Sequence, residues 1–224
     1  MKKYAVIVAG GLGQRMGAEM PKQFLLLNGK PLLEYTLQAF LQAFDDLNII
    51  LVLPGEHIAK GMEIIKNINT EEKIQIIAGG ETRFQSVKNG LNYITHPSIV
   101  FVHDGVRCLV SQKLIQNCYE QAVEKGSAIP AVTAADSIRI DEGSSHFTID
   151  RSKVRIIQTP QTFQSGILAE AFKQEYNSSF TDEAAVAEAA GYKVFLIQGD
   201  YNNVKITRPI DLYIAEKLLQ EIIS

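Results

Sequence analysis

Four glycines and two cations near the amino terminus could together bind a polyphosphate. Residues 10–17 read GGLGQRMG, they follow an apolar segment at Tyr4–Val8, and a Pro-Lys pair comes just after them. Glycine lets the backbone turn tightly and bring several N–H groups toward one ligand. Arg15 and Lys22 would add positive charge beside those donors. The stretch therefore indicates a phosphate cradle, and a nucleotide is the first ligand to consider.

Two common glycine-rich motifs do not fit this loop. The dinucleotide fingerprint GxGxxG fits Gly11 and Gly13 but meets Met16 at its third glycine, and no acidic residue clearly closes a ribose site further on. A P-loop needs a glycine five residues before its Gly-Lys pair, but Phe24 stands there before Gly29-Lys30. The signature GGxGxR followed by PK, typical of sugar-nucleotide pyrophosphorylases, matches throughout. A glycine-rich turn without a ligand is the alternative, but it does not explain the two cations together.

A second glycine pair and a strand-end carboxylate follow. Gly79-Gly80 precede a helical pattern with Arg83 and Ser86 in its first turn, where Ser86 could bond a base or a ribose. Ordinary turn chemistry would also explain the glycines. Asp104 ends an apolar strand, where a carboxylate needs a cationic partner or a metal. Mg²⁺ that arrives with a nucleotide would suit it, and an ion pair with Arg107 is the alternative.

Two basic residues and one helix start complete the set of candidates. Lys205 lies in an apolar, strand-like stretch before the last helix, where a substrate phosphate would pair with it. Arg151 has no evident local partner. Thr181 precedes Asp182-Glu183, and this order is typical of a helix with a threonine N-cap and acidic residues in its first turn.

Apolar runs alternate with helical patterns along the chain. Leu33, Leu37 and Phe40 share one face of a helix, and Pro209 suits the first turn of the last helix. We expect the apolar face of that last helix to consist of Ile210, Ile214, Leu218 and Ile222. We expect strands at Tyr4–Val8, Asn48–Leu53, Ile74–Ala78, Ile99–His103, Ser127–Val132, Val154–Gln158 and Lys193–Ile197.

This alternation predicts an α/β fold, a mostly parallel sheet with helices on both faces. Such sheets bind ligands beyond the carboxyl ends of their strands, where the motifs above lie. We expect one domain over residues 1–224.

Residues 136–150 interrupt the alternation. The short runs Ser137–Ile140 and His146–Ile149 flank a turn at Asp141–Ser144 and predict a β-hairpin. A two-stranded hairpin is marginal by itself in water. We therefore expect this arm to pack on its own sheet or on a partner subunit.

Composition excludes several classes of protein. The 224 residues carry a net charge of −3, which disfavours nucleic-acid binding. No apolar run reaches the roughly 18–20 residues of a membrane span, and the amino terminus has no signal-peptide pattern. Cys108 and Cys118 lack the spacing of a zinc site. We expect a cytoplasmic protein with two reduced, packed thiols.

Taken in order, these motifs resemble those of the 2-C-methyl-D-erythritol 4-phosphate cytidylyltransferase family, from Tyr4 to the last helix. The resemblance rests on Gly10 to Met16, Pro21-Lys22-Gln23, Gly79-Gly80 with Arg83 and Ser86-Val87, Val102-His103-Asp104, Asp150-Arg151, Thr159-Pro160-Gln161, Thr181 to Ala184 and Asn203 to Thr207. It implies a Rossmann-like nucleotidyltransferase fold with a protruding hairpin arm. It also implies transfer of CMP from CTP to 2-C-methyl-D-erythritol 4-phosphate in non-mevalonate isoprenoid biosynthesis, with Mg²⁺ and release of pyrophosphate.

The resemblance also implies a role for each candidate. Arg15 and Lys22 would stabilise the pentavalent α-phosphate, and Arg151 and Lys205 would hold the acceptor; these four are the candidate catalytic residues. Asp104 is the candidate Mg²⁺ ligand. The candidate nucleotide contacts are Ala9, Gly10, Gly11, Leu12, Gly13, Gly79, Gly80, Arg83, Ser86, Asp104 and Gly105. The candidate acceptor contacts are Asp104, Arg107, Ser137, Arg151, Thr181 and Lys205. A homodimer with exchanged arms would bring Arg151 into the neighbour's site.

Three departures from the family pattern concern the acceptor pocket. Gly105-Val106 stands where Ala-Ala is usual, Cys108 replaces a proline, and Ser137 replaces a common threonine. The alternatives are a ribitol 5-phosphate cytidylyltransferase and a catalytically silent nucleotide-binding regulator of the same fold. The pattern around Arg83 and the Thr181 segment favour methylerythritol phosphate over ribitol phosphate.

Overall fold

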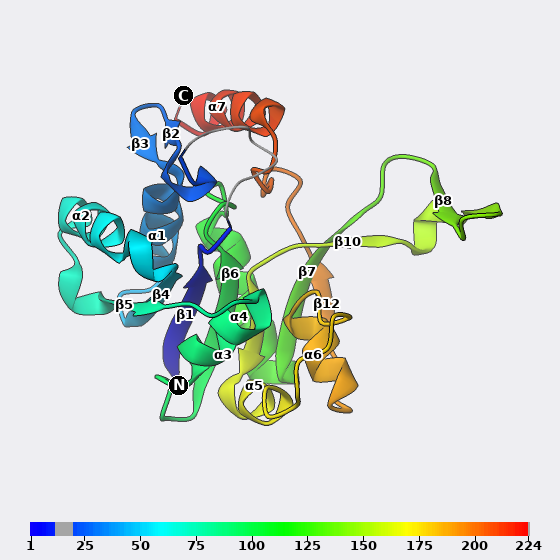
Figure 1. Ribbon diagram of the computed structural model, residues 1–224, viewed down its shortest axis with the longest axis horizontal. Helices are drawn as coiled ribbons and strands as arrows, with labels where there is room; N and C mark the ends of the chain where they lie inside the picture. The colour runs from blue at the N-terminus through cyan, green and yellow to red at the C-terminus, as the bar shows by residue number, and fades with distance from the viewer. Residues whose placement is uncertain (12–19, 224) are drawn as a thin grey trace.

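A computed structural model describes residues 1–11 and 20–223 of the chain (Figure 1). Its centre is an eight-stranded sheet in the order β10-β7-β11-β6-β1-β4-β5, with β12 paired to β7. Its strands are β1 (Lys2–Val8), β4 (Leu47–Leu53), β5 (Ile74–Ala78), β6 (Ser98–Asp104), β7 (Ser127–Thr133), β10 (Arg155–Ile157), β11 (Gln161–Gln164) and β12 (Leu196–Gln198).

The half of the sheet formed by β5, β4, β1 and β6 is parallel. Val8 at the end of β1 lies opposite Val52 on one side and Asp104 on the other, and Leu53 lies opposite Ala78. The carboxyl ends of these strands therefore meet at one edge, as expected for the site. Every residue of β6 is buried, and its central residues, Ile99 to Val102, form a continuous apolar run, as is typical of a strand covered on both faces.

The other half contains an unexpected strand. β11 runs antiparallel between β6 and β7, and β10 is antiparallel to β7. The sheet is still mostly parallel, as the sequence predicted, but β11 did not appear among the expected strands. Its residues are Gln161, Thr162, Phe163 and Gln164, and a segment with one apolar side chain gives no hydropathy signal.

Helices cover both faces because side chains alternate along β1. Ala5 and Ile7 belong to a core cluster with Phe40, while Val6 belongs to a second cluster with Phe84 on the opposite face. The first cluster includes residues of α1 (Leu32–Ala43), α2 (Ile58–Ile68) and α4 (Gln112–Lys125), and the second includes residues of α3 (Arg83–Leu91), α5 (Ser165–Ala171) and α6 (Glu183–Ala189).

The last helix, α7 (Pro209–Ile223), begins at the expected proline but packs through a different face. Ile210 and Ile214 are 58% and 44% exposed. The buried residues are instead Ala215 and Leu219, which join a small cluster with Leu27 of β2 (Leu26–Leu27). The expected apolar face is therefore wrong at its first two positions, because α7 packs on this small cluster and not on the main sheet (Figure 1).

The expected hairpin forms as its own two-stranded sheet, separate from the main one. It consists of β8 (Ile138–Asp141) and β9 (His146–Ile149), with Ile140 opposite Phe147. Figure 1 shows it projecting far from the body of the molecule. Within the described residues, no helix is both long enough and apolar enough to cross a membrane.

Candidate active site

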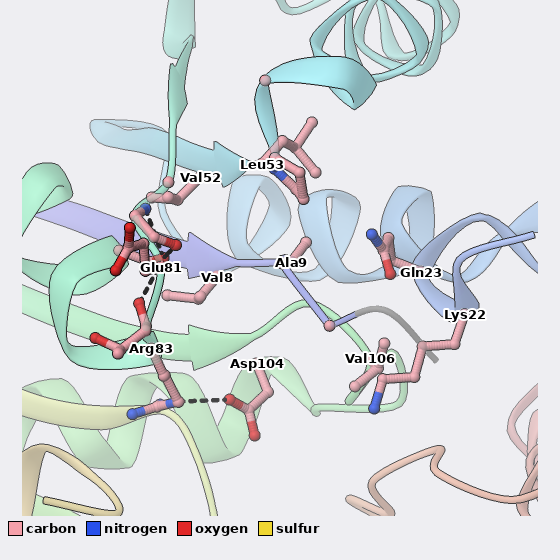
Figure 2. Close-up of a pocket in the computed structure, with 18 of the residues that line it drawn as sticks. Val8, Ala9, Lys22, Gln23, Val52, Leu53, Glu81, Arg83, Asp104 and Val106 are labelled. Atoms are coloured by element: carbon pink, nitrogen blue, oxygen red, sulfur yellow. Dashed lines mark hydrogen bonds and ion pairs between the residues drawn. The ribbon is translucent and has the colours of Figure 1, made fainter. Parts of the chain in front are cut away.

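A cavity of about 590 Å³ opens at the carboxyl ends of the parallel strands (Figure 2). Loops after β1, β4, β5 and β6 form its wall, together with Lys22 and Lys205 from elsewhere in the chain. The predicted site residues that line it are Ala9, Gly10, Gly11, Lys22, Gly79, Gly80, Arg83, Ser86, Asp104 and Lys205. Residues separated by almost two hundred positions therefore meet at the edge that the strand pattern indicated.

The first glycine loop is described as far as Gly11, where it lies against Lys22. A Cβ atom on Gly11 would be 3.1 Å from Cε of Lys22, so the lysine side chain passes close to the loop backbone. Figure 2 shows the side chain of Lys22 directed toward the end of this loop. The remaining predicted residues of the loop, Leu12, Gly13 and Arg15, lie outside the described residues.

The second glycine loop, after β5, is closed by Ser86. The Ser86 hydroxyl accepts a hydrogen bond from the N–H of Gly80 at 3.1 Å and donates one to the carbonyl of Thr82 at 2.9 Å. A Cβ atom on Gly79 would lie 2.9 Å from Oγ of Ser86, and one on Gly80 would clash with the side chain of Gln85. Both glycines are therefore required by close approach, and Ser86 holds the loop against the start of α3.

A cluster of five charged side chains lies at one end of the cavity, and three of them, Arg83, Asp104 and Lys205, line it. Lys205 Nζ lies 2.7 Å from Oδ2 of Asp104, and Arg83 Nε lies 3.3 Å from Oδ1. Arg107 Nε lies 3.9 Å from Oδ2. Burial disfavours the Asp104 anion, but Arg83, Lys205 and Arg107 outweigh it and hold the pKa of Asp104 well below its usual range. Asp104 is therefore ionised at neutral pH.

Glu183, the fifth member of this charge cluster, holds Arg83 from the opposite side. Nη1 and Nη2 of Arg83 lie 2.5 and 3.0 Å from the two carboxylate oxygens of Glu183. Glu183 is only 1% exposed. Although burial opposes the charge, the two carboxylates Glu183 and Asp104 keep the pKa of Arg83 above its usual value. The guanidinium is thus fixed between two anions.

Glu183 was not among the predicted site residues, although it lies within the Thr181–Ala184 segment of the resemblance. An acid in the first turn of a helix also interacts favourably with the helix dipole, and its partner Arg83 is 100 residues away. Gln23 was also missed: it lines the cavity, is 1% exposed, and its carboxamide makes no hydrogen bond within the described residues. A buried amide needs a partner, and this one lies beside Lys22 where a ligand or a water could supply it.

The helix start at Thr181 is corrected by the structure. Asp182 is the N-cap of α6, since its carboxylate accepts a hydrogen bond from the N–H of Ala185 at 2.9 Å. The same carboxylate accepts a bond from Gln161 of β11 at 3.0 Å. Thr181 is exposed just before the cap, so the threonine N-cap was wrong, whereas the acidic first turn at Glu183 is confirmed.

His103 behaves as a satisfied strand-end histidine. Its Nε2 lies 3.2 Å from the carbonyl of Arg107, which can only accept, so the ring proton is on Nε2. Nδ1 then accepts from the hydroxyl of Thr159 at 3.0 Å, and that hydroxyl accepts from the N–H of Asp104 at 3.1 Å. Burial lowers the pKa of His103 to about 3. This neutral network fixes the backbone that carries Asp104.

Within the described part of the chain, five predicted acceptor or nucleotide residues do not line the cavity of their own chain, and Thr181 is one of them. Arg107 is buried and donates to the carbonyl of Asn203 at 2.8 Å. Ser137 and Arg151 are exposed near the ends of the hairpin, and Arg151 donates to the carbonyl of Ala135 at 2.6 Å. Gly105 packs so closely on Ala9 that a Cβ atom there would lie 2.9 Å from that of Ala9.

The donor set around Asp104 does not suit a magnesium ion. Both carboxylate oxygens of Asp104 face cations, whose positive charges oppose the approach of a further cation. Within the part of the chain that the structure describes, no group of three or more acidic, histidine or cysteine side chains could hold a metal. Asp104 therefore acts as an anchor for basic side chains in this arrangement.

Comparison with known proteins gives consistent matches along the whole chain. Residues 4–221 match the family model described as IspD, 2-C-methyl-D-erythritol 4-phosphate cytidylyltransferase. Proteins of that name from Phocaeicola vulgatus and Porphyromonas gingivalis are 44% and 45% identical; the alignments cover 98% and 97% of this chain and 100% and 98% of the relatives.

Solved structures agree. A 4-diphosphocytidyl-2C-methyl-D-erythritol synthase from Anaerococcus prevotii has a TM-score of 0.84 at 28% identity and covers 98% of this chain and 96% of its own. A 2-C-methyl-D-erythritol 4-phosphate cytidylyltransferase from Thermus thermophilus has a TM-score of 0.76 at 31% identity, covering 98% of this chain and 100% of its own.

Proposed function

The chain belongs to the 2-C-methyl-D-erythritol 4-phosphate cytidylyltransferase family, and we propose that the cavity at the carboxyl edge of its sheet is where it performs the family reaction. The enzyme transfers CMP from CTP to 2-C-methyl-D-erythritol 4-phosphate. One observation supports this location of the active site: two glycine loops, Lys22 and Lys205 line the same cavity. Cations and backbone donors of this kind suit two anionic substrates.

The chemical step needs positioning more than proton transfer. An oxygen of the acceptor phosphate attacks the α-phosphorus of CTP, a new P–O bond forms, and the bond to the β-phosphate oxygen breaks to release pyrophosphate. The attacking phosphate is already an anion, so no general base is needed. Catalysis then consists of aligning two anions and neutralising charge in the transition state. Lys22, together with Arg15, is our candidate for that neutralisation.

Magnesium enters this proposal as part of the substrate. A nucleoside triphosphate binds Mg²⁺ through its own phosphate oxygens, and the ion often keeps several waters. Because Asp104 is surrounded by basic side chains that repel a further cation, we route no step through it. We propose a cytoplasmic location, since both substrates are highly charged metabolites.

The two glycine loops are the proposed nucleotide side of the cavity. Ala9 to Gly11 and Gly79 to Ser86 present backbone groups at close range, which supports recognition of the edge of a pyrimidine base. Lys205 is the proposed acceptor side: its side chain is 41% exposed while its ammonium is held by Asp104. Arg107 and Thr181 stay predictions for that side.

The hairpin is the proposed dimerisation arm. Ile140 and Phe147 lie opposite each other across its strands and are 40% and 49% exposed. An isolated hairpin with an exposed apolar pair is marginal in water, which supports packing against a second copy of the chain. Arg151 lies two residues after the end of β9. In the proposed homodimer, the arm carries Arg151, with Ser137, to the partner's acceptor site.

Pyrophosphate release tests this function directly. The purified protein is assayed with CTP, UTP, ATP or GTP, each with 2-C-methyl-D-erythritol 4-phosphate or ribitol 5-phosphate. We expect strong release only with CTP and methylerythritol phosphate. Preferential use of ribitol phosphate would indicate the alternative acceptor, and nucleotide binding without release would indicate a silent regulator. Equal use of purine nucleotides would refute the proposed base site.

A further inference from the structure

The charge cluster alternates in sign from one end to the other. Glu183 binds Arg83 through both carboxylate oxygens, Arg83 donates through Nε to Asp104, and Asp104 binds Lys205. Glu183 is the most deeply buried of these four, at 1% exposed. Lys205, at the other end, is the most exposed. A row of this kind joins a buried acid on α6 to a lysine that reaches the cavity.

We propose that Glu183 is a positioning residue, which occupies Arg83 so that Asp104 remains free to orient Lys205 toward the acceptor phosphate. The inference rests on the proposed function, because it takes Lys205 as an acceptor ligand. Glu183 itself does not line the cavity and acts through Arg83.

Competition for Asp104 is the physical reason for this role. Arginine prefers to bind a carboxylate through two parallel N–H bonds, and such bidentate pairs are stronger than single bonds. Arg83 makes its bidentate pair with Glu183 and only a single bond, through Nε, with Asp104. Without an acid at position 183, both Nη groups would turn to Asp104. Lys205 is the weaker competitor, because its strongly hydrated ammonium can return to water.

The backbone around Glu183 is fixed, as a positioning role requires. Gln161 of β11, which is 1% exposed, accepts a hydrogen bond from the N–H of Ala184 at 2.8 Å and donates one to Asp182 at 3.0 Å. The start of α6 is therefore tied to the central sheet on both sides of Glu183. This attachment sets the position of the carboxylate relative to β6, which ends at Asp104.

The test compares Glu183→Gln with Glu183→Asp, and Glu188→Gln serves as a matched control on the exposed side of the same helix. Glutamine keeps the size of the side chain but removes its charge, whereas aspartate keeps the charge on a shorter stem. We expect the Gln variant to raise KM for the acceptor at least tenfold, with KM for CTP changed less than threefold. The Glu183→Asp variant should have an acceptor KM between those of the Gln variant and the wild type. The acceptor KM of the Glu188→Gln control should match that of the wild type.

A second measurement separates positioning from folding. Calorimetry with the acceptor and an α,β-methylene analogue of CTP gives binding without turnover, for Glu183→Gln, Lys205→Gln and the double variant. If Glu183 acts through Lys205, the double variant binds the acceptor no more weakly than Lys205→Gln does. A purely structural role would lower the melting temperature and the active fraction but leave acceptor KM unchanged, and that result would overturn the inference. Absence of turnover by the wild type would instead refute the proposed function.

Discussion

Replacing Asp104 by asparagine isolates the contribution of one carboxylate to a cluster of three cations. The change keeps the shape of the side chain and removes only its charge. Arg83 would retain Glu183 as an anionic partner, and Lys205 would be stabilised by water because its side chain is 41% exposed. Arg107 would be left without a compensating charge, since its side chain is 11% exposed and its remaining polar contact is a hydrogen bond to the neutral carbonyl of Asn203.

The expected cost follows from this division. Removing one partner of a buried ion pair typically costs 3–5 kcal/mol, so with one cation left uncompensated we expect about 3 kcal/mol. For a chain of this size that corresponds to a melting temperature lower by roughly 6–12 °C. Glu170→Gln is the control, because the side chains of Glu170 and its partner Lys173 are 56% and 69% exposed. Such a pair contributes about 0–1 kcal/mol.

The pH dependence gives the refuting measurement. The pKa of Asp104 is lower in the folded protein than the value of about 3.9 in the unfolded chain. Its stabilising effect is therefore complete above about pH 5 and is lost as the pH falls through the folded value. Urea unfolding should show a constant difference between wild type and variant from pH 8 to 5, and a shrinking one below about pH 4. Equal stability at pH 7, or a difference that grows in acid, would refute the ion-pair argument.

Three further outcomes are expected. Lys22→Ala and Arg15→Ala should each lower kcat by about 10²–10³ with a smaller effect on CTP affinity, because their charge acts mainly in the transition state; weaker CTP binding at unchanged kcat would contradict this. Mixing Arg151→Ala with Lys22→Ala subunits should restore activity at one site per heterodimer, whereas no recovery in verified heterodimers would place Arg151 outside the partner's site. Burial raises the pKa of Cys108 and Cys118 to about 12, so both thiols should react with Ellman's reagent at pH 8 far more slowly in the native protein than in urea, and equal rates would contradict their burial.

The parallel strands and the hairpin could be predicted because each depends on the hydropathy pattern and turn residues of its own segment. The parallel strands are apolar runs bounded by glycine or proline, and the hairpin has alternation on both sides of a turn. β5 appears with the predicted bounds, Ile74–Ala78, and β8 and β9 differ little from expectation. β11 could not be predicted from its own residues, which include one apolar side chain. It forms a strand because it pairs with β6 on one side and β7 on the other.

The same limit applies to the candidate site. Glycine loops followed by cations are readable in order, and the structure brings Lys22 and Lys205 to one cavity. The ion-pair partner of a charged side chain could not be predicted in this way, because it depends on which strands and helices come together. The sequence offered an ion pair with nearby Arg107 as the alternative to a metal at Asp104. That pair forms at 3.9 Å, but the cation closest to Asp104 is Lys205 at 2.7 Å, about a hundred residues away.

The place of β11 also constrains how the chain is made. β6 and β7 are consecutive among the strands of the main sheet, yet β11 separates them in space. On the ribosome, the roughly 60 residues between the end of β6 and the end of β11 take about 3–12 s to synthesise. Throughout that interval one edge of a fully buried strand has no ladder partner. Unpaired edges invite pairing with other chains, so the nascent protein is most exposed to aggregation before Gln164 emerges.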